Sequence, residues 1–203
     1  MDRYNFDESK FSSWVQEGIP IDIIRKYGIS YDKLNNAIVI PMYDNNGNIV
    51  NISNRTLYSD FRNRKIPKYI YSFGWNGGGI DILWGYSFKK DIIKESKKVI
   101  IVEGVKSVLK LEAFGHDNTV AILTSHLNTL QMQQLIQLNV KEFIFALDMN
   151  VNIRNDSNIM LLKRYGKLSF LRDYRKRLGE KDSPCDGGKE LFDELYNGRY
   201  VIN

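Results

Sequence analysis

The fold of this chain is decided by the stretch Val99-Ile100-Ile101-Val102-Glu103-Gly104. Its run of β-branched apolar residues predicts a strand that is buried on both faces, as the strands of parallel sheets are. A helix is expected next, over residues 107–112, because apolar side chains continue there and Gly115 can end the helix. A buried strand followed at once by a helix is the repeating unit of α/β proteins.

The same alternation continues toward the C-terminal end of the sequence. Further strands are expected at residues 119–123, 142–148 and 168–174, and further helices at residues 130–138, 158–165 and 187–196. Repeated strand–helix units imply a mainly parallel sheet flanked by helices. We therefore expect residues 91–203 to form an α/β domain.

Residues 1–90 follow a different pattern, which predicts a small mixed subdomain and makes the whole chain α+β. Helical segments within residues 9–27 precede strands expected at residues 37–43, 48–57 and 68–73. Asp44-Asn45-Asn46-Gly47 joins the first two strands and is typical of a tight hairpin, because Asn and Gly tolerate positive φ. The glycine-rich residues 74–79 are expected to form a mobile loop.

Composition excludes several classes of protein. The 203 residues contain one Cys, which rules out a disulfide framework, a Cys-rich zinc site and a Cys-x-x-Cys redox pair. No apolar run reaches the ~18 residues of a membrane span, and the first residues lack the pattern of a signal peptide, so a cytoplasmic protein is expected. The net charge of +5 permits a polyanionic partner without requiring one.

Three acidic residues follow expected strands, namely Glu103, Asp148 and Asp182. Ligands of open α/β sheets bind outside the carboxyl ends of the strands, so we expect these side chains at one edge. Carboxylates that converge repel one another unless a cation neutralises them, and Mg²⁺ prefers such oxygen ligands. The alternative is that each acid caps the helix that follows it. Their occurrence after successive strands favours the cation site.

Two motifs resemble the Toprim domain, a metal-binding fold shared by bacterial-type primases, topoisomerases and some nucleases. One is the stretch Val99–Gly104, which ends in Glu-Gly. The other, about 45 residues later, is Phe145-Ala146-Leu147-Asp148-Met149-Asn150. The resemblance implies that Glu103 and Asp148 belong to one metal-binding centre.

The N-terminal half is similar to the basic part of the DnaG-type primase catalytic core. The matching segments are Ile38–Val50, Asn54-Arg55-Thr56-Leu57 and Pro67-Lys68-Tyr69. The resemblance extends over residues 11–196. It is greatest to primase-like proteins of phages and mobile elements, whose tails resemble Lys181-Asp182-Ser183-Pro184-Cys185-Asp186.

The resemblance implies a role in DNA replication: synthesis of short RNA primers on single-stranded DNA by metal-dependent nucleotidyl transfer. Glu103 would act as general base or lie beside the metal, and Asp148 would bind it. Mg²⁺ or Mn²⁺ would be held by Glu103, Asp148, Asn150 and Asp182. Single-stranded DNA or ribonucleoside triphosphates would contact Arg55, Arg62, Arg64, Lys68, Tyr69, Lys106 and His126. Further implied partners are a replicative helicase and a separate zinc-binding module.

Three positions depart from the family pattern. Asn150 stands where the family has a second Asp, Ser107 where many primases have an acid, and Val105 where phage-like relatives often have one. An amide can offer a carbonyl oxygen to Mg²⁺ but brings no negative charge. Two alternatives therefore stay open: a catalytically degenerate module that binds DNA or a replication partner, and a Toprim nuclease.

Other reactive residues carry weaker expectations. His116 is expected to be solvated after a helix end, and Cys185 to lie in a polar loop without a base that could activate it. Arg172, Arg175, Lys176 and Arg177 are expected on a solvated face, with a nucleic-acid contact as the alternative. The sequence contains no Walker A motif, so it is not itself the helicase.

Overall fold

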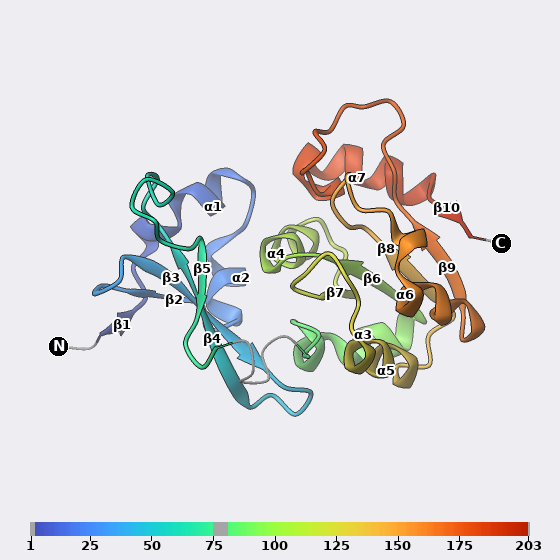
Figure 1. The fold of residues 1–203 in the computed structure, drawn as a ribbon, viewed down its shortest axis with the longest axis horizontal. Coiled ribbons are helices and arrows are strands. Elements are labelled where there is room, and N and C mark those ends of the chain that lie inside the picture. Colours follow the sequence, from blue (N-terminus) through green and yellow to red (C-terminus); the bar gives the residue numbers. More distant parts are fainter. Residues whose placement is uncertain (1–2, 75–80, 203) are drawn as a thin grey trace. The chain divides into compact units, whose positions relative to one another are not determined.

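The computed structural model describes residues 3–74 and 81–202, which belong to two compact units, residues 1–80 and 81–203 (Figure 1). The sequence places this boundary ten residues later, at residue 90. Residues 81–90 belong to the second unit because Trp84 forms a β-bridge with Ala121 and because a helix starting at Tyr86 packs on the second sheet. The glycine-rich residues 75–79, expected to be a mobile loop, lie outside the described residues.

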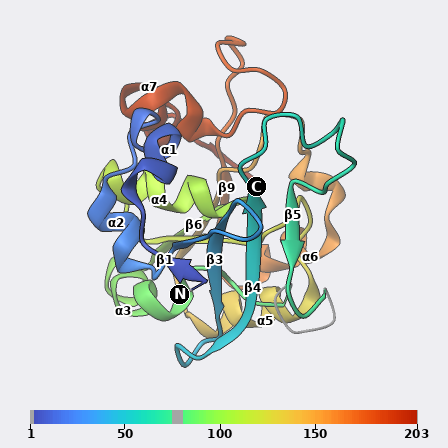
Figure 2. The ribbon, with the colours of Figure 1, turned by 90° about the vertical axis from the view of Figure 1, so that its left-hand side faces the viewer.

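The first unit contains an antiparallel sheet of five strands in the order β1-β2-β3-β4-β5 (Figure 2). The strands are β1 (Tyr4–Asn5), β2 (Ser30–Asp32), β3 (Ala37–Tyr43), β4 (Ile49–Thr56) and β5 (Tyr69–Tyr71). A 3₁₀ helix η1 (Glu8–Phe11) and two α-helices, α1 (Ser12–Gln16) and α2 (Ile21–Lys26), precede β2. The sequence predicts β3, β4 and β5 but not β1 and β2.

The expected hairpin between β3 and β4 is present. The Asp44 carboxylate accepts hydrogen bonds from the backbone N–H groups of Asn46 at 2.9 Å and of Asn48 at 2.8 Å. Gly47 has φ of +88°, which a residue with a side chain rarely adopts. Local turn chemistry therefore fixes the register of the two long strands.

The second unit contains a sheet in the order β10-β9-β8-β6-β7, parallel except for β10. Its strands are β6 (Lys98–Val102), β7 (Thr119–Ala121), β8 (Glu142–Phe145), β9 (Lys167–Phe170) and β10 (Tyr200–Val201). Its α-helices are α3 (Tyr86–Ser96), α4 (Val105–Ala113), α5 (Thr129–Gln137), α6 (Ser157–Leu161) and α7 (Gly188–Asn197). Short 3₁₀ helices are η3 (Ile153–Asn155), η4 (Leu162–Arg164) and η5 (Pro184–Gly187). The expected mainly parallel sheet is confirmed.

Helices cover both faces of this sheet (Figure 1). Val99 and Ile101 of β6 belong to one buried cluster with Ile93 of α3, Leu135 of α5 and Ile159 of α6. The alternate residues of β6 are also fully buried, and they point to the face covered by α4 and α7. Burial of both faces explains the uninterrupted apolar run of β6.

Across residues 3–74 and 81–202, none of the helices combines the length and the apolar character that crossing a membrane requires.

Candidate metal and nucleotide site

Strand order places the candidate site at the carboxyl edge of the second sheet. The chain runs from β6 outward to β7 on one side and returns to β8 on the other side, so its direction reverses between β6 and β8. Such a reversal leaves a crevice beyond the strand ends, where ligands of open α/β sheets bind. Glu103 directly follows β6, and Asp148 lies just beyond β8.

These two acids line one pocket of about 480 Å³, which we call the acid pocket. Its other polar side chains come from the loops that follow β7, β8 and β9. They are Ser125, His126, Asn150, Asn152, Asn155 and Lys181. The structure therefore brings together Glu103, Asp148, Asn150 and His126, four of the residues singled out from the sequence.

Glu103 is a partly buried carboxylate without a protein partner. Burial raises its pKa, and the charge of His126 opposes that shift only in part. No hydrogen bond or ion pair to its side chain occurs among residues 3–74 and 81–202. A cation that enters the pocket would stabilise the charged form of such a carboxylate.

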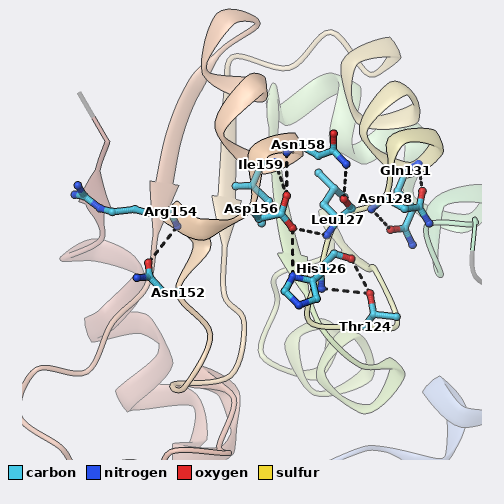
Figure 3. A network of polar contacts seen from close by, with 10 residues as sticks. All are labelled: Thr124, His126, Leu127, Asn128, Gln131, Asn152, Arg154, Asp156, Asn158 and Ile159. Atoms are coloured by element: carbon cyan, nitrogen blue, oxygen red, sulfur yellow. Dashed lines mark hydrogen bonds and ion pairs between the residues drawn. The ribbon is translucent and has the colours of Figure 1, made fainter.

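The backbone around His126 is fixed while its ring is left in solvent (Figure 3). Leu127 N–H donates to the Asp156 carboxylate at 2.8 Å, and the Asn158 amide donates to the Leu127 carbonyl at 2.8 Å. The His126 side chain is 81% exposed, and its Nδ1 lies 3.8 Å from Asp156 Oδ2. The imidazole is thus available to a ligand at a defined position.

Asp156 and Lys181 are two site residues that the sequence analysis did not identify. Asp156 caps α6 by accepting from the N–H groups of Asn158 and Ile159, at 3.0 and 3.1 Å, and it also holds the His126 loop. Its position one residue before a helix is an N-cap signal that the sequence does carry. Lys181 lines the acid pocket from a long loop, and no local sequence signal indicates that position.

Two of the expected site residues lie elsewhere. The Asp182 carboxylate accepts from Gly179 N–H at 2.8 Å, and the Asp182 carbonyl accepts from Met149 N–H at 3.0 Å. Asp182 therefore closes a loop, and its neighbour Lys181 faces the pocket. Lys106 is in the first turn of α4 and does not line the acid pocket.

The donor set of the acid pocket fits one hard divalent cation. Glu103 and Asp148 supply carboxylates and Asn150 supplies an amide oxygen. Within the described residues, no three Asp, Glu, His or Cys side chains gather into a cation-binding group. One or two carboxylates are enough for Mg²⁺, which usually keeps several waters and binds substrate phosphates.

The basic residues of the first unit that were expected to bind nucleic acid lie on or between β4 and β5. Arg55 and Tyr69 are register partners on these strands, and the Arg55 guanidinium lies 5.8 Å from the centre of the Trp14 ring. Arg55 Nε is buried without a hydrogen-bond partner among the described residues. Tyr69 is 41% exposed, with Lys68 Nζ 5.9 Å from its ring.

Arg62 and Arg64 lie in the loop between β4 and β5 and are exposed. Arg64 forms an ion pair with Asp60 at 2.7 Å and stacks on Tyr58 at 4.4 Å. The guanidinium of Arg62 lies 5.8 Å from the Phe61 ring. The charge of Arg64 is therefore partly neutralised by Asp60 in the same loop. The Phe61 ring beside Arg62 carries no charge.

Two weaker expectations are wrong, and a third is wrong for one of its four residues. His116 is not simply solvated, because its Nε2 lies 2.8 Å from Asp193 and its ring packs against Phe192. Cys185 is 2% exposed and not in a polar loop, since η5 carries it into the core. Of the four basic residues expected on a solvated face, Arg175, Lys176 and Arg177 are exposed, and Arg172 is partly buried.

Comparisons with known proteins agree with this geometry. Residues 97–152 match the Toprim domain family. The chain is 29% identical to the SPbeta prophage-derived uncharacterized protein YorJ of Bacillus subtilis (strain 168), over 93% of this chain and 57% of that protein. It is 32% identical to a DNA primase of Buchnera aphidicola subsp. Baizongia pistaciae, over 62% of this chain. The chain spans only 21% of that primase.

Solved structures show the same fold. The Aquifex aeolicus primase, comprising zinc-binding and RNA polymerase domains, superposes with a TM-score of 0.78 at 22% identity, over 97% of this chain and 57% of that one. A DnaG primase catalytic domain bound to single-stranded DNA superposes with a TM-score of 0.71 at 17% identity, over 95% of this chain and 72% of that one. Residues 97–152 of this chain therefore match the Toprim domain, and the chain as a whole has the fold of the DnaG-type primase catalytic core.

Proposed function

We propose that this protein is a primase-type nucleotidyltransferase, which joins ribonucleotides on a single-stranded DNA template with Mg²⁺ or Mn²⁺. The observation that carries the proposal is that Glu103 and Asp148, from adjacent parallel strands, line one pocket. The DNA primases among its relatives and the DNA-bound primase structure support the choice of reaction and template.

The residues of the acid pocket suit the attack of a ribonucleotide 3′-hydroxyl on a nucleoside triphosphate. Glu103, Asp148 and the Asn150 amide oxygen would hold the cation, which neutralises phosphate charge when it is bound. Lys181 and His126 can donate to phosphate oxygens at the same pocket. If Glu103 instead lies beside the cation, its carboxylate can accept the proton of the attacking hydroxyl.

The basic side chains of the first unit suit the template strand. Arg55 and Lys68 offer donors for phosphate oxygens, and exposed Tyr69 offers a ring for base stacking. The proposal places this reaction in DNA replication in the cytoplasm. A replicative helicase would be a partner, and zinc-binding residues would come from outside the 203 residues, which contain one Cys.

Calorimetry with Mn²⁺ tests the proposal first, on the wild type and on the Glu103→Gln and Asp148→Ala variants. We expect micromolar binding that either substitution weakens by at least about tenfold, since each removes a charged ligand. Glu95→Gln, on the exposed side of α3, is the matched control. Primer synthesis from ribonucleotides on single-stranded DNA should then be lost in the same two variants. Absence of Mn²⁺ binding at millimolar concentration would rule out an autonomous enzyme.

A specific observation favours a second candidate, a degenerate module that binds DNA or a replication partner. Asn150 brings no charge to the acid pocket, and Asp182 does not line it. Such a module would bind single-stranded DNA with a strong salt dependence but would make no primers, even after Asn150→Asp. Nicking of plasmid DNA without nucleotides would instead indicate a Toprim nuclease.

A further inference from the structure

A second pocket, of about 400 Å³, lies beside the acid pocket and shares a wall with it. Both pockets are lined by Asp148, Asn150, Val151 and Asn152. We call the second one the aromatic pocket, because Phe170 and Tyr174 line its other side. The two pockets are therefore adjacent, and a ligand that spanned both would contact residues 148–152.

The aromatic side is supported from behind. Tyr174 is 63% exposed, and its ring meets the Tyr200 ring edge to face with 4.8 Å between centroids. The Tyr200 ring also lies 5.6 Å from the Phe170 ring. Tyr174 is thus an exposed ring that packs on Tyr200, which in turn packs on Phe170, and a flat heterocycle can stack on such a ring.

Two guanidinium groups complete the aromatic pocket. Arg172, expected to be solvated, instead donates to the Met149 carbonyl. This hydrogen bond joins the segment after β9 to residues 148–152, which form the shared wall. Arg154 is exposed, and its guanidinium makes no hydrogen bond or ion pair within residues 3–74 and 81–202. Figure 3 shows its side chain pointing away from the Asp156 network. Its donors are therefore available to a ligand oxygen.

We propose that the aromatic pocket binds the base and sugar of a nucleotide whose phosphates lie in the acid pocket. The two pockets suit different parts of a nucleotide. The oxygen ligands, Lys181 and His126 of the acid pocket suit a cation and phosphates. Tyr174 and Arg154 of the aromatic pocket suit a base. The nucleotide can be a free triphosphate or the end of a strand, since both present the same base and sugar. This inference rests on the proposed function, because it assigns the phosphates to the acid pocket.

Calorimetry with Mn²⁺ present, comparing ATP with inorganic tripolyphosphate, tests the proposal. We expect the wild type to bind ATP about tenfold more tightly than tripolyphosphate, the contribution of one stacked base. Tyr174→Ala and Arg154→Ala should reduce that preference and leave tripolyphosphate and Mn²⁺ binding unchanged. Tyr174→Phe, which keeps the ring, should retain the preference. Tyr165→Ala, at another exposed tyrosine that lines neither pocket, should retain it as well.

The outcomes separate this inference from the proposed function. Equal affinity for ATP and tripolyphosphate in the wild type, or an ATP preference that survives Tyr174→Ala and Arg154→Ala, would overturn the aromatic pocket alone. Failure of Mn²⁺ and of both phosphates to bind would overturn the proposed function together with it. A short oligonucleotide that competes with ATP in the wild type, and competes less in Tyr174→Ala, would identify the strand end as an occupant.

Discussion

Glu142, at the start of β8, and Glu103, just past the end of the neighbouring β6, lie at opposite ends of one parallel sheet. Arg199 donates to both oxygens of Glu142 at 2.9 Å, and the Ser169 hydroxyl donates at 2.6 Å. Burial alone would raise the pKa of Glu142, but these partners lower it to about 2. At Glu103, burial raises the pKa and the protein supplies no comparable partner.

The difference separates a carboxylate that holds the fold from one that is kept for a ligand. A buried carboxylate with a full set of donors has no capacity left for a cation from solution. A carboxylate that is desolvated and unpaired is destabilising in the free protein, and a bound cation relieves that cost. The same residue type therefore stabilises the fold at one sheet edge and, in the proposed function, binds a cation at the other.

The largest effect is expected from Glu142→Gln, which leaves the Arg199 guanidinium, only 15% exposed, without its charge partner. Breaking a buried ion pair from one side costs about 3 kcal/mol of unfolding free energy. Urea unfolding monitored by circular dichroism measures this loss. Exposed Glu95→Gln, the matched control, should change stability by less than about 0.5 kcal/mol.

The pH dependence of the Glu142 contribution has a defined sign. Its native pKa of about 2 lies below the ordinary value of 4.5, so the stabilisation is present above pH 4.5. It is lost as the pH falls toward 2. The difference between wild type and Glu142→Gln should therefore shrink with acidification over this range. A constant difference would mean that the carboxylate charge is not what stabilises this edge.

An intermediate effect is expected from Asn150→Asp, which gives the acid pocket a third carboxylate. Mn²⁺ affinity should rise about tenfold, because cation affinity follows the number of charged ligands. Calorimetry measures it, with Asn63→Asp as a control that adds the same charge in the first unit. An equal gain in both variants would show that net charge, and not the pocket, attracts the cation.

The smallest effect is expected from Glu103→Gln without metal, which should raise the unfolding free energy at pH 7 by about 0.5–2 kcal/mol. A raised native pKa means that this group favours the fold below its ordinary pKa of 4.5 and loses that contribution as the pH rises. The advantage of the variant should therefore be larger at pH 7 than at pH 4. Urea unfolding at both pH values decides this, and a less stable variant at pH 7 would contradict the comparison.

Local pattern determined most of the fold from the sequence. The apolar run of β6, the hairpin signal at residues 44–47 and the strand–helix alternation are properties of neighbouring residues, and the structure has each of them. The strands β1 and β10 contain two residues each, too few to show a periodic pattern, and β2, with three residues, was also not expected. The helix α3, in which only Lys89 and Ile93 are buried, was also not expected from the sequence.

The site residues also fall into those that the sequence predicts and those that only the tertiary structure places. Glu103 and Asp148 could be predicted because residues directly after adjacent parallel strands are brought to one edge by the sheet register. Asp182 and Lys181 lie in the loop between β9 and η5, where no register fixes which side chain faces inward. Only the tertiary structure decided that Lys181 lines the acid pocket and Asp182 closes a turn, because that choice depends on hydrogen bonds to Met149 and Gly179.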